Sequence, residues 1–337
     1  MPPLEENLDL LLRRLHGLAS RRPGFAVTLF GEAGIGKSFT ARALLPRVSC
    51  ATFSGHATQS LSSVLLALPR PKKCPVSLER TLERLQNGET LEQNVVQETL
   101  RNLLSSLAPC VLYLEDLHEC TAEQLELWST LASSLLHVRG VALLSSSRVT
   151  PPKTFEVLAL ERLSPLQSRA LLEGDIHTVL PPEACAWIYA KAAGNPLFTL
   201  EFFRSLARQG FAYSDGQRWH WRVPPNDLVP VSVEAMIERV LLEATHLPET
   251  QNSETQQALE ALALIPEGSP ELLCAVSSLE RSSLESAILH LTARGILLRS
   301  SFAHPLYREM TLKNLSLERR KILSRRALEA LKELDAE

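Results

Sequence analysis

A glycine-rich octapeptide near the N-terminus constrains the fold of this chain more than any other feature. It reads Gly31-Glu-Ala-Gly-Ile-Gly-Lys-Ser38 and fits G-x-x-x-x-G-K-[ST], the pattern of a phosphate-binding P-loop. An apolar run of strand length, Phe25–Phe30, precedes it, and a segment of helical character, Ser38–Leu45, follows and ends at Pro46. Strand, glycine-rich loop and helix form the context that the pattern requires. The alternative is an ordinary glycine-rich turn.

The chemistry of this loop follows from its residue types. Glycines let the backbone turn its N–H groups toward phosphate oxygens, and the N-terminus of the following helix adds its positive end. Lys37 is expected to reach the β- and γ-phosphates and Ser38 to hold Mg²⁺. The sequence therefore predicts a nucleotide site, whose loop residues are Gly31, Glu32, Ala33, Gly34, Ile35, Gly36, Lys37, Ser38 and Phe39.

Two acids follow a second apolar run about 75 residues after the loop. Cys110–Leu114 has the composition of a buried parallel strand, and Glu115 and Asp116 come directly after it. Acids at the carboxyl end of such a strand can hold Mg²⁺ and its water shell, or orient the attacking water. We predict Glu115 and Asp116 as catalytic and metal-binding residues. Which of the two lies nearer to Mg²⁺ stays open, as does the simpler interpretation of a strand that ends in a polar loop.

A cationic side chain follows the next apolar run. Gly140–Leu144 is expected to be a strand beside Cys110–Leu114, and Arg148 comes after it. The planar donor fork of an arginine suits a sensor of the γ-phosphate. We predict Arg148 as a third catalytic residue, and a surface arginine is the alternative.

The alternation of elements predicts the fold class. Strands expected at 25–30, 48–53, 110–114, 140–144 and 155–160 alternate with helical stretches, which indicates a parallel α/β sheet of the P-loop NTPase type. The predicted domains are an α/β domain at 1–162, a helical lid with a β-hairpin at 163–245, and a mostly helical, winged-helix-like domain at 246–337.

Composition limits the expected partners and cellular compartment. A net charge of −3 gives no overall attraction to nucleic acid or to anionic membranes, and no apolar run reaches the ~18 residues of a membrane span. The six cysteines are scattered without a C-x-x-C pair, which favours a reducing, cytoplasmic setting without structural zinc. Arg319–Lys321 and Arg325–Arg326 could contact nucleic acid, but interleaved acids make a solvated helix face the favoured interpretation.

Several motifs in this order resemble the STAND class of AAA+-related P-loop ATPases, as found in bacterial transcription regulators and nucleotide cyclases. The resemblance covers nearly the whole chain. It depends on the loop at 31–38, Leu114-Glu-Asp-Leu-His118, Ser147-Arg148, Gly194-Asn-Pro-Leu197 and Phe302-Ala-His-Pro-Leu-Tyr-Arg308.

The resemblance implies ATP or ADP with Mg²⁺, bound between the α/β domain and a helical lid. It implies that Pro196 lies against the adenine and that His304 helps to hold an ADP-bound closed state, with a buried, hydrogen-bonded histidine as the alternative. Relatives usually carry a Gly-Arg-Glu motif near the N-terminus, where this chain reads Pro3-Leu-Glu-Glu-Asn7, and usually Asp where it has Glu115.

Three functions are compatible with these features. The favoured one is a switch ATPase that hydrolyses ATP slowly and regulates a protein partner, or its own association, in transcription or signalling. The second is a DNA-associated ATPase of the origin-binding or clamp-loader type. The third is a nucleotide-binding scaffold that does not hydrolyse.

Overall fold

A computed structural model describes residues 3–71, 74–245, 249–298 and 301–334. The contacts between Cα atoms divide the chain into two compact units. The first comprises Met1–Gly31 and Gly36–Glu161, and the second comprises Glu32–Ile35 and Arg162–Glu337. The four central residues of the glycine-rich loop therefore group with the second unit.

The first unit is built on a five-stranded parallel sheet in the order β2-β3-β4-β1-β5. Its strands are β1 (Phe25–Phe30), β2 (Ala51–His56), β3 (Cys110–Glu115), β4 (Val141–Ser147) and β5 (Glu156–Ala159). The three central strands are almost wholly buried, because helices cover both faces of the sheet. Continuous apolar runs therefore predicted β1 and β3 with nearly correct bounds, whereas β4 continues three residues beyond its predicted end at Leu144, through the polar Ser145–Ser147. The predicted fold class is confirmed.

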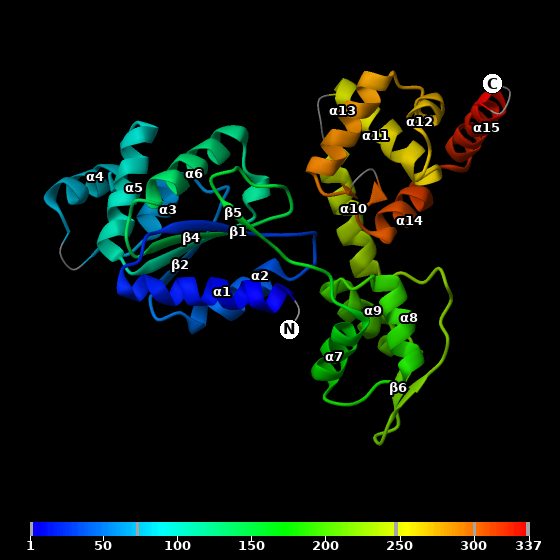
Figure 1. Ribbon diagram of the computed structural model, residues 1–337, viewed down its shortest axis with the longest axis horizontal. Coiled ribbons are helices and arrows are strands. Elements are labelled where there is room, and N and C mark those ends of the chain that lie inside the picture. The colour runs from blue at the N-terminus through cyan, green and yellow to red at the C-terminus, as the bar shows by residue number, and fades with distance from the viewer. Residues whose placement is uncertain (1–2, 72–73, 246–248, 299–300, 335–337) are drawn as a thin grey trace. The chain divides into compact units, whose positions relative to one another are not determined.

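Helices cover the two faces of this sheet in separate groups. The first-unit helices are α1 (Pro3–Gly17), α2 (Lys37–Leu44), α3 (Leu61–Ala67), α4 (Val76–Gln86), α5 (Gln93–Leu107) and α6 (Ala122–Leu135). Figure 1 shows α1 and α2 on one face and α3, α5 and α6 on the other. On the second face, leucines of α3, α5 and α6 pack against inward side chains of β3 such as Leu112 and Leu114 in one hydrophobic cluster.

The bounds predicted for β2 are wrong by three residues. The apolar composition of 48–53 placed the strand there, whereas β2 spans Ala51–His56 and pairs with β3 from Cys110 to Glu115. As an edge strand, β2 leaves most of its side chains partly or fully exposed, so its position is determined by backbone pairing and not by apolar side chains. Its last residue, His56, consequently lies opposite Glu115 at the carboxyl edge of the sheet.

The second unit is mostly helical. Its helices are α7 (Pro165–Ile176), α8 (Pro182–Ala192), α9 (Pro196–Arg208), α10 (Val231–Thr245), α11 (Glu249–Leu264), α12 (Pro270–Ser277), α13 (Arg281–Ala293), α14 (Pro305–Asn314) and α15 (Leu317–Leu334). Two antiparallel pairs complete it, β6 (Ala212–Ser214) with β7 (Trp219–Trp221) and β8 (Leu297–Leu298) with β9 (Ser301–Phe302). The β-hairpin expected within 163–245 is confirmed as the pair β6 and β7.

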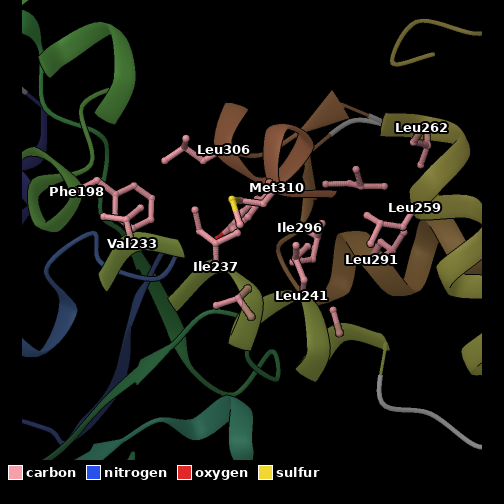
Figure 2. Close-up of a cluster of buried hydrophobic side chains, with 14 of the residues drawn as sticks. Phe198, Val233, Ile237, Leu241, Leu259, Leu262, Leu291, Ile296, Leu306 and Met310 are labelled. Carbon is pink, nitrogen blue, oxygen red and sulfur yellow. The ribbon is translucent and has the colours of Figure 1, made fainter. Parts of the chain in front are cut away.

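One hydrophobic cluster runs through this unit from α7 to α15. Figure 2 shows its centre, where Phe198 of α9 and Ile237 of α10 lie in one apolar region with Met310 of α14. Side chains on both sides of residue 245 belong to this cluster, so the division at 245/246 stays a prediction. Among the described residues, no helix is long and apolar enough to cross a membrane.

Candidate functional site

The ends of the glycine-rich loop belong to the first unit and have the geometry of a phosphate cradle. Gly31 follows β1, and its N–H donates to Ser147 O of β4 at 3.2 Å. Lys37, the first residue of α2, is only 8% exposed, and its Nζ donates to Gly31 O at 2.8 Å. The lysine ammonium is therefore held inside the curve of the loop, where the motif requires a cation.

The N-terminus of α2 fits an anionic ligand. Gly36 caps the helix with φ 101°, a left-handed conformation that favours glycine, and no side chain caps the first turn. A Cβ on Gly36 would meet no atom within 4 Å, so the space beside this backbone is open. The donors of a helix start and the Lys37 ammonium together suit a nucleotide phosphate. Phe39, one turn further, is 78% exposed.

The middle of the loop is bonded within the second unit. Arg162 forms a bidentate ion pair with Glu32, from Nε to Oε1 at 3.1 Å and from Nη2 to Oε2 at 2.7 Å, and also donates to Ala303 O. Asn195 Nδ2 donates to the same Glu32 Oε1 at 2.9 Å. The Glu32 side chain is only 11% exposed and that of Arg162 31%. This shielding makes the pair stronger than a surface ion pair.

The turn before α9 holds the loop backbone. Asn195 Nδ2 also donates to Ala33 O at 2.8 Å, and Leu197 N donates to Gly34 O at 3.3 Å. Gly34 has φ +78°, and a Cβ there would lie 2.8 Å from Asn195 Oδ1, so only glycine fits. Pro196 is the first residue of α9 and is half-buried. The Gly194–Leu197 segment thus contacts the loop through the Asn195 side chain and the backbone of Leu197.

His304 lies in the same unit and is completely buried. Its Nε2 donates to Ala192 O at 2.9 Å, and its Nδ1 accepts from Leu306 N at 3.1 Å, which defines a neutral ring. Burial lowers the pKa of His304, although the bond to Ala192 O opposes this. The geometry is that of the buried, hydrogen-bonded histidine given as the alternative, and a role at the nucleotide stays a prediction.

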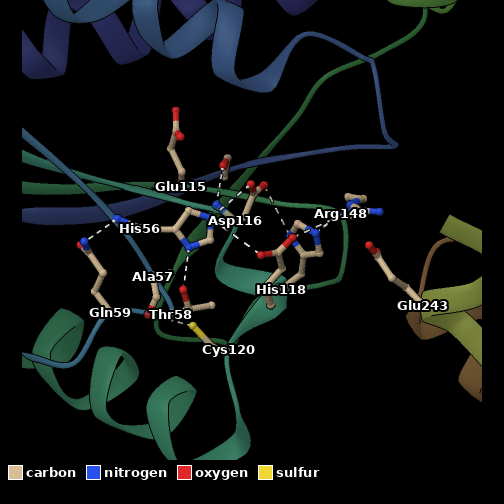
Figure 3. Close-up of polar contacts among 12 residues, drawn as sticks. His56, Ala57, Thr58, Gln59, Glu115, Asp116, His118, Cys120, Arg148 and Glu243 are labelled. Carbon is tan, nitrogen blue, oxygen red and sulfur yellow. Dashed lines mark hydrogen bonds and ion pairs between the residues drawn. The ribbon is translucent and has the colours of Figure 1, made fainter. Parts of the chain in front are cut away.

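The two predicted acids lie at the carboxyl end of β3, in the first unit, and point in different directions (Figure 3). Glu115 lies toward α2, where its Oε1 is 3.7 Å from a guanidinium nitrogen of Arg42. Asp116 has φ 54° and ψ 54°, which is uncommon for a non-glycine residue, and its N–H donates to Ser146 Oγ at 3.0 Å. The sharp turn at Asp116 separates the two carboxylates.

Arg148 joins Asp116 through a histidine. Its Nε donates to His118 Nε2 at 2.7 Å, and its Nη2 lies 3.9 Å from Glu119 Oε1. His118 Nδ1 in turn lies 3.9 Å from Asp116 Oδ1. The side chains of Arg148 and His118 are 16% and 6% exposed. The arginine is thus already ordered beside the acids.

Tyr113 lies beneath this region on β3. Its side chain is 2% exposed, and its hydroxyl makes no hydrogen bond of good geometry within the described residues. Burial raises the pKa of Tyr113, the hydroxyls of Ser146 and Ser38 partly oppose this, and the charges of Glu115 and Asp116 add to it.

The structure places the predicted site residues in two groups. Glu115, Asp116 and Arg148 lie at one edge of the sheet in the first unit, together with Gly31 and Gly36–Phe39. Glu32–Ile35, Pro196 and His304 lie in the second unit. The side chains of Pro3–Asn7, where the usual Gly-Arg-Glu motif is missing, lie outside the described residues.

Sequence reasoning missed three residues that the structure brings to these groups. Asn195 was quoted within a motif but given no role, and its position before Pro196 at a helix start was a usable signal. Arg162 carries no local signal, because its partner Glu32 lies 130 positions away. His56 was missed because β2 was expected to end at Phe53.

The fold and these features define a class of protein. A five-stranded parallel sheet, a P-loop between β1 and α2, and acids at the end of β3 make this chain a P-loop NTPase in fold. Residues 4–144 match the family model of an AAA ATPase domain. The match includes the glycine-rich loop and both acids, so this part of the chain is similar to an AAA ATPase domain.

Solved structures agree with the fold. The Walker-type ATPase PABY2304 of Pyrococcus abyssi has 12% sequence identity, covers 89% of this chain and 94% of its own, and has a TM-score of 0.58. The Aeropyrum pernix ORC1 protein in complex with DNA has 17% identity, covers 93% and 92%, and has a TM-score of 0.47. The first similarity shows the fold alone, and the TM-score of the second is too low to add to it. Among curated proteins, no sequence matches the chain significantly.

Proposed function

We propose that this chain is an ATP-dependent switch, which binds ATP with Mg²⁺, hydrolyses it slowly and regulates a protein partner in transcription or signalling. One observation carries the proposal. The middle of the glycine-rich loop is bonded by Arg162, Asn195 and Leu197 of the helical unit. A change in the loop on nucleotide binding therefore has a direct route into that unit.

The bonding pattern explains how the loop can bind a phosphate and contact the helical unit at the same time. The helical unit donates hydrogen bonds to two loop carbonyls and to the Glu32 carboxylate, and these acceptors are not the N–H donors that a phosphate needs. Lys37 now donates to Gly31 O, and a bound phosphate competes for this ammonium. ATP and ADP shift a conformational equilibrium only by their differential affinity for its states. The γ-phosphate beside Lys37 supplies such a difference.

The roles of the acids follow from their directions. Glu115 lies on the side of α2, which begins with Lys37 and Ser38, so Glu115 and Ser38 are proposed to hold Mg²⁺. Asp116 follows Glu115 at the turn and points in a different direction, and it is proposed to orient the attacking water. Mg²⁺ in such a site neutralises charge that develops on the phosphate oxygens. Arg148, held at His118, is proposed to contact the γ-phosphate.

Nucleotide identity in freshly purified protein is the decisive experiment. Extraction is expected to release ADP or ATP, and Mg-ATP at 100 times its Kd is expected to stabilise the protein by ~2.7 kcal/mol in a thermal unfolding assay. Lys37→Ala should abolish both effects, whereas Lys153→Ala, at an exposed lysine outside the loop, should not. Absence of bound nucleotide and of any thermal shift in the unaltered protein would reject the proposal.

Hydrolysis is tested separately. Glu115→Gln and Asp116→Asn are expected to lower phosphate release while nucleotide stays bound. Bound nucleotide without phosphate release, unaffected by either substitution, would identify the non-hydrolysing scaffold instead. Coupling is tested with Asn195→Ala, which is expected to change the ratio of the ATP and ADP affinities because it removes the bond to Ala33 O.

The DNA-associated alternative has little support in the basic run of α15. Arg319 is paired with Glu260 at 2.7 Å, and Arg326 donates to Val276 O at 3.4 Å, so both are used within the unit. Arg320 and Arg325 are exposed. Salt-dependent DNA binding that weakens when these two are replaced by alanine would favour the alternative over a protein partner.

A further inference from the structure

We propose that His56, Asp116 and Glu119 form a binding site for a first-row divalent ion of the zinc class, separate from the Mg²⁺ ligands Ser38 and Glu115. One ligand atom from each of the three residues lies within 4.8 Å of the others. His56 Nε2 is 3.7 Å from Asp116 Oδ2 and 3.8 Å from Glu119 Oε2. Figure 3 shows the imidazole and the Asp116 carboxylate facing one another at the edge of the sheet.

These distances are close to those of an occupied site. Ligand atoms ~2.1 Å from a tetrahedral ion lie roughly 3.4 Å apart. The two distances from His56 Nε2 therefore exceed this value by only a few tenths of an ångström, and the two carboxylate oxygens lie within 4.8 Å of one another. One imidazole and two carboxylates leave a further coordination position for water, as in sites with three protein ligands. The imidazole nitrogen favours zinc over Mg²⁺, which prefers oxygen ligands alone.

The backbone fixes all three ligands. His56 ends β2 opposite Glu115, so the pairing of β2 with β3 places it beside Asp116. Ala57 N also donates to Glu115 O at 2.9 Å and extends this pairing. Glu119 N donates to Asp116 O at 3.0 Å in the turn that follows β3. His56, Asp116 and Glu119 thus lie on a sheet edge and one tight turn, which limits how far the three side chains can separate.

A hydroxyl outside the triad orients the imidazole. Thr58 Oγ1 lies 2.8 Å from His56 Nδ1. When Nδ1 carries the proton and donates to this oxygen, the lone pair of Nε2 points toward the two carboxylates. Such a partner on the second ring nitrogen is found on most histidines that bind metals. The three ligand side chains are 32–36% exposed, so an ion can enter from solvent.

The ion would also affect the proposed hydrolysis. Coordination of Asp116 Oδ2 withdraws the carboxylate that is proposed to orient water, so zinc is expected to slow phosphate release at saturating Mg²⁺. This consequence rests on the proposed function, whereas binding of the ion does not. Direct binding to nucleotide-free protein is therefore the primary test, and its result stands even if the protein hydrolyses nothing.

The test is a titration of the full chain, free of any affinity tag, with Co²⁺ and Zn²⁺. Co²⁺ is expected to give d–d absorption bands that saturate at one ion per chain and disappear when Zn²⁺ is added. His56→Ala should weaken binding at least about tenfold, and Thr58→Val, which keeps the side-chain volume, should weaken it by roughly tenfold through the lost orienting bond. His137→Ala removes an exposed histidine elsewhere in the first unit and should have no effect.

Two results would overturn the site. Equal affinities of the unaltered protein and His56→Ala would show that the imidazole is not a ligand. A thiolate-to-metal charge-transfer band would assign the ion to cysteines such as Cys120. If the protein hydrolyses ATP, His56→Ala should also escape inhibition by zinc, and inhibition that persists in this variant would reject the effect on Asp116.

Discussion

The ion pair between Glu32 and Arg162 is expected to stabilise the helical unit measurably. Both side chains are largely shielded, and their two hydrogen bonds measure 2.7 and 3.1 Å. Exposed ion pairs contribute ~0–1 kcal/mol, whereas breaking a fully buried pair costs about 3–5 kcal/mol. Arg162 keeps its bond to Ala303 O when Glu32 is changed, and its 31% exposure lets water solvate the charge. We therefore expect a coupling energy of about 2 kcal/mol.

A double-mutant cycle isolates this quantity. It compares the parent, Glu32→Gln, Arg162→Gln and the double variant by urea unfolding without nucleotide. Three of the four tryptophans, Trp187, Trp219 and Trp221, lie in the second unit. A Trp128→Phe background therefore makes the fluorescence report this unit alone. With an m value of roughly 2 kcal/mol/M, each single substitution should lower the midpoint by about 1 M.

The double variant should then be little less stable than either single variant, because each substitution already removes the shared interaction. Additive losses, with a coupling energy below ~0.5 kcal/mol, would refute the reasoning. That result would also weaken the proposed route from the glycine-rich loop into the helical unit. Glu32→Gln is matched in shape to the native side chain, so a large loss cannot be attributed to a cavity.

Two further predictions test the folding of each unit. Gly24→Ala should remove the cooperative melting transition of the first unit or lower its stability by at least about 2 kcal/mol, because a Cβ would lie 2.3 Å from a backbone oxygen. Gly174→Ala, on a helix with open space, should be neutral or slightly stabilising. Burial lowers the pKa of His304 in the folded state below the ordinary 6.5 of the unfolded state. As pH falls below 6.5, the unfolded state therefore binds more protons than the folded state, and the second unit should lose stability. The urea midpoints at pH 5.5 and 7.5 should differ less in His304→Gln than in the parent. His290, whose pKa burial also lowers, contributes to this difference in both proteins. An unchanged difference would therefore contradict the prediction.

The parts of the site that local sequence encodes were predictable. A P-loop is a strand, a turn and a helix start within a few residues, and Lys37 lies where the motif places it. The acids at the end of β3 follow a buried strand whose apolar run is continuous, so their position at the sheet edge could be inferred before their directions were known.

Contacts that join distant residues could not be predicted in this way. Glu32 looks like a variable position of the P-loop, and nothing near Arg162 or Asn195 shows that both bind it. His56 illustrates a different failure, because an error of three residues in one edge strand moved it away from the sheet edge. Alternating burial identifies a strand that is covered on one side, but it carries little information where the side chains are mostly exposed.

The sequence of the glycine-rich loop is constrained both by space for a phosphate and by contact with the helical unit. Gly36 needs a left-handed backbone and an open face for a phosphate. Gly34 needs a left-handed backbone and also the absence of a Cβ, because Asn195 lies against it. The motif leaves the residue at position 34 free, and in this chain a glycine there also allows the close approach of Asn195. The fixed residues of the loop suit a nucleotide, and its variable residues Glu32 and Gly34 contact the helical unit, which is the basis of the proposed coupling between the two.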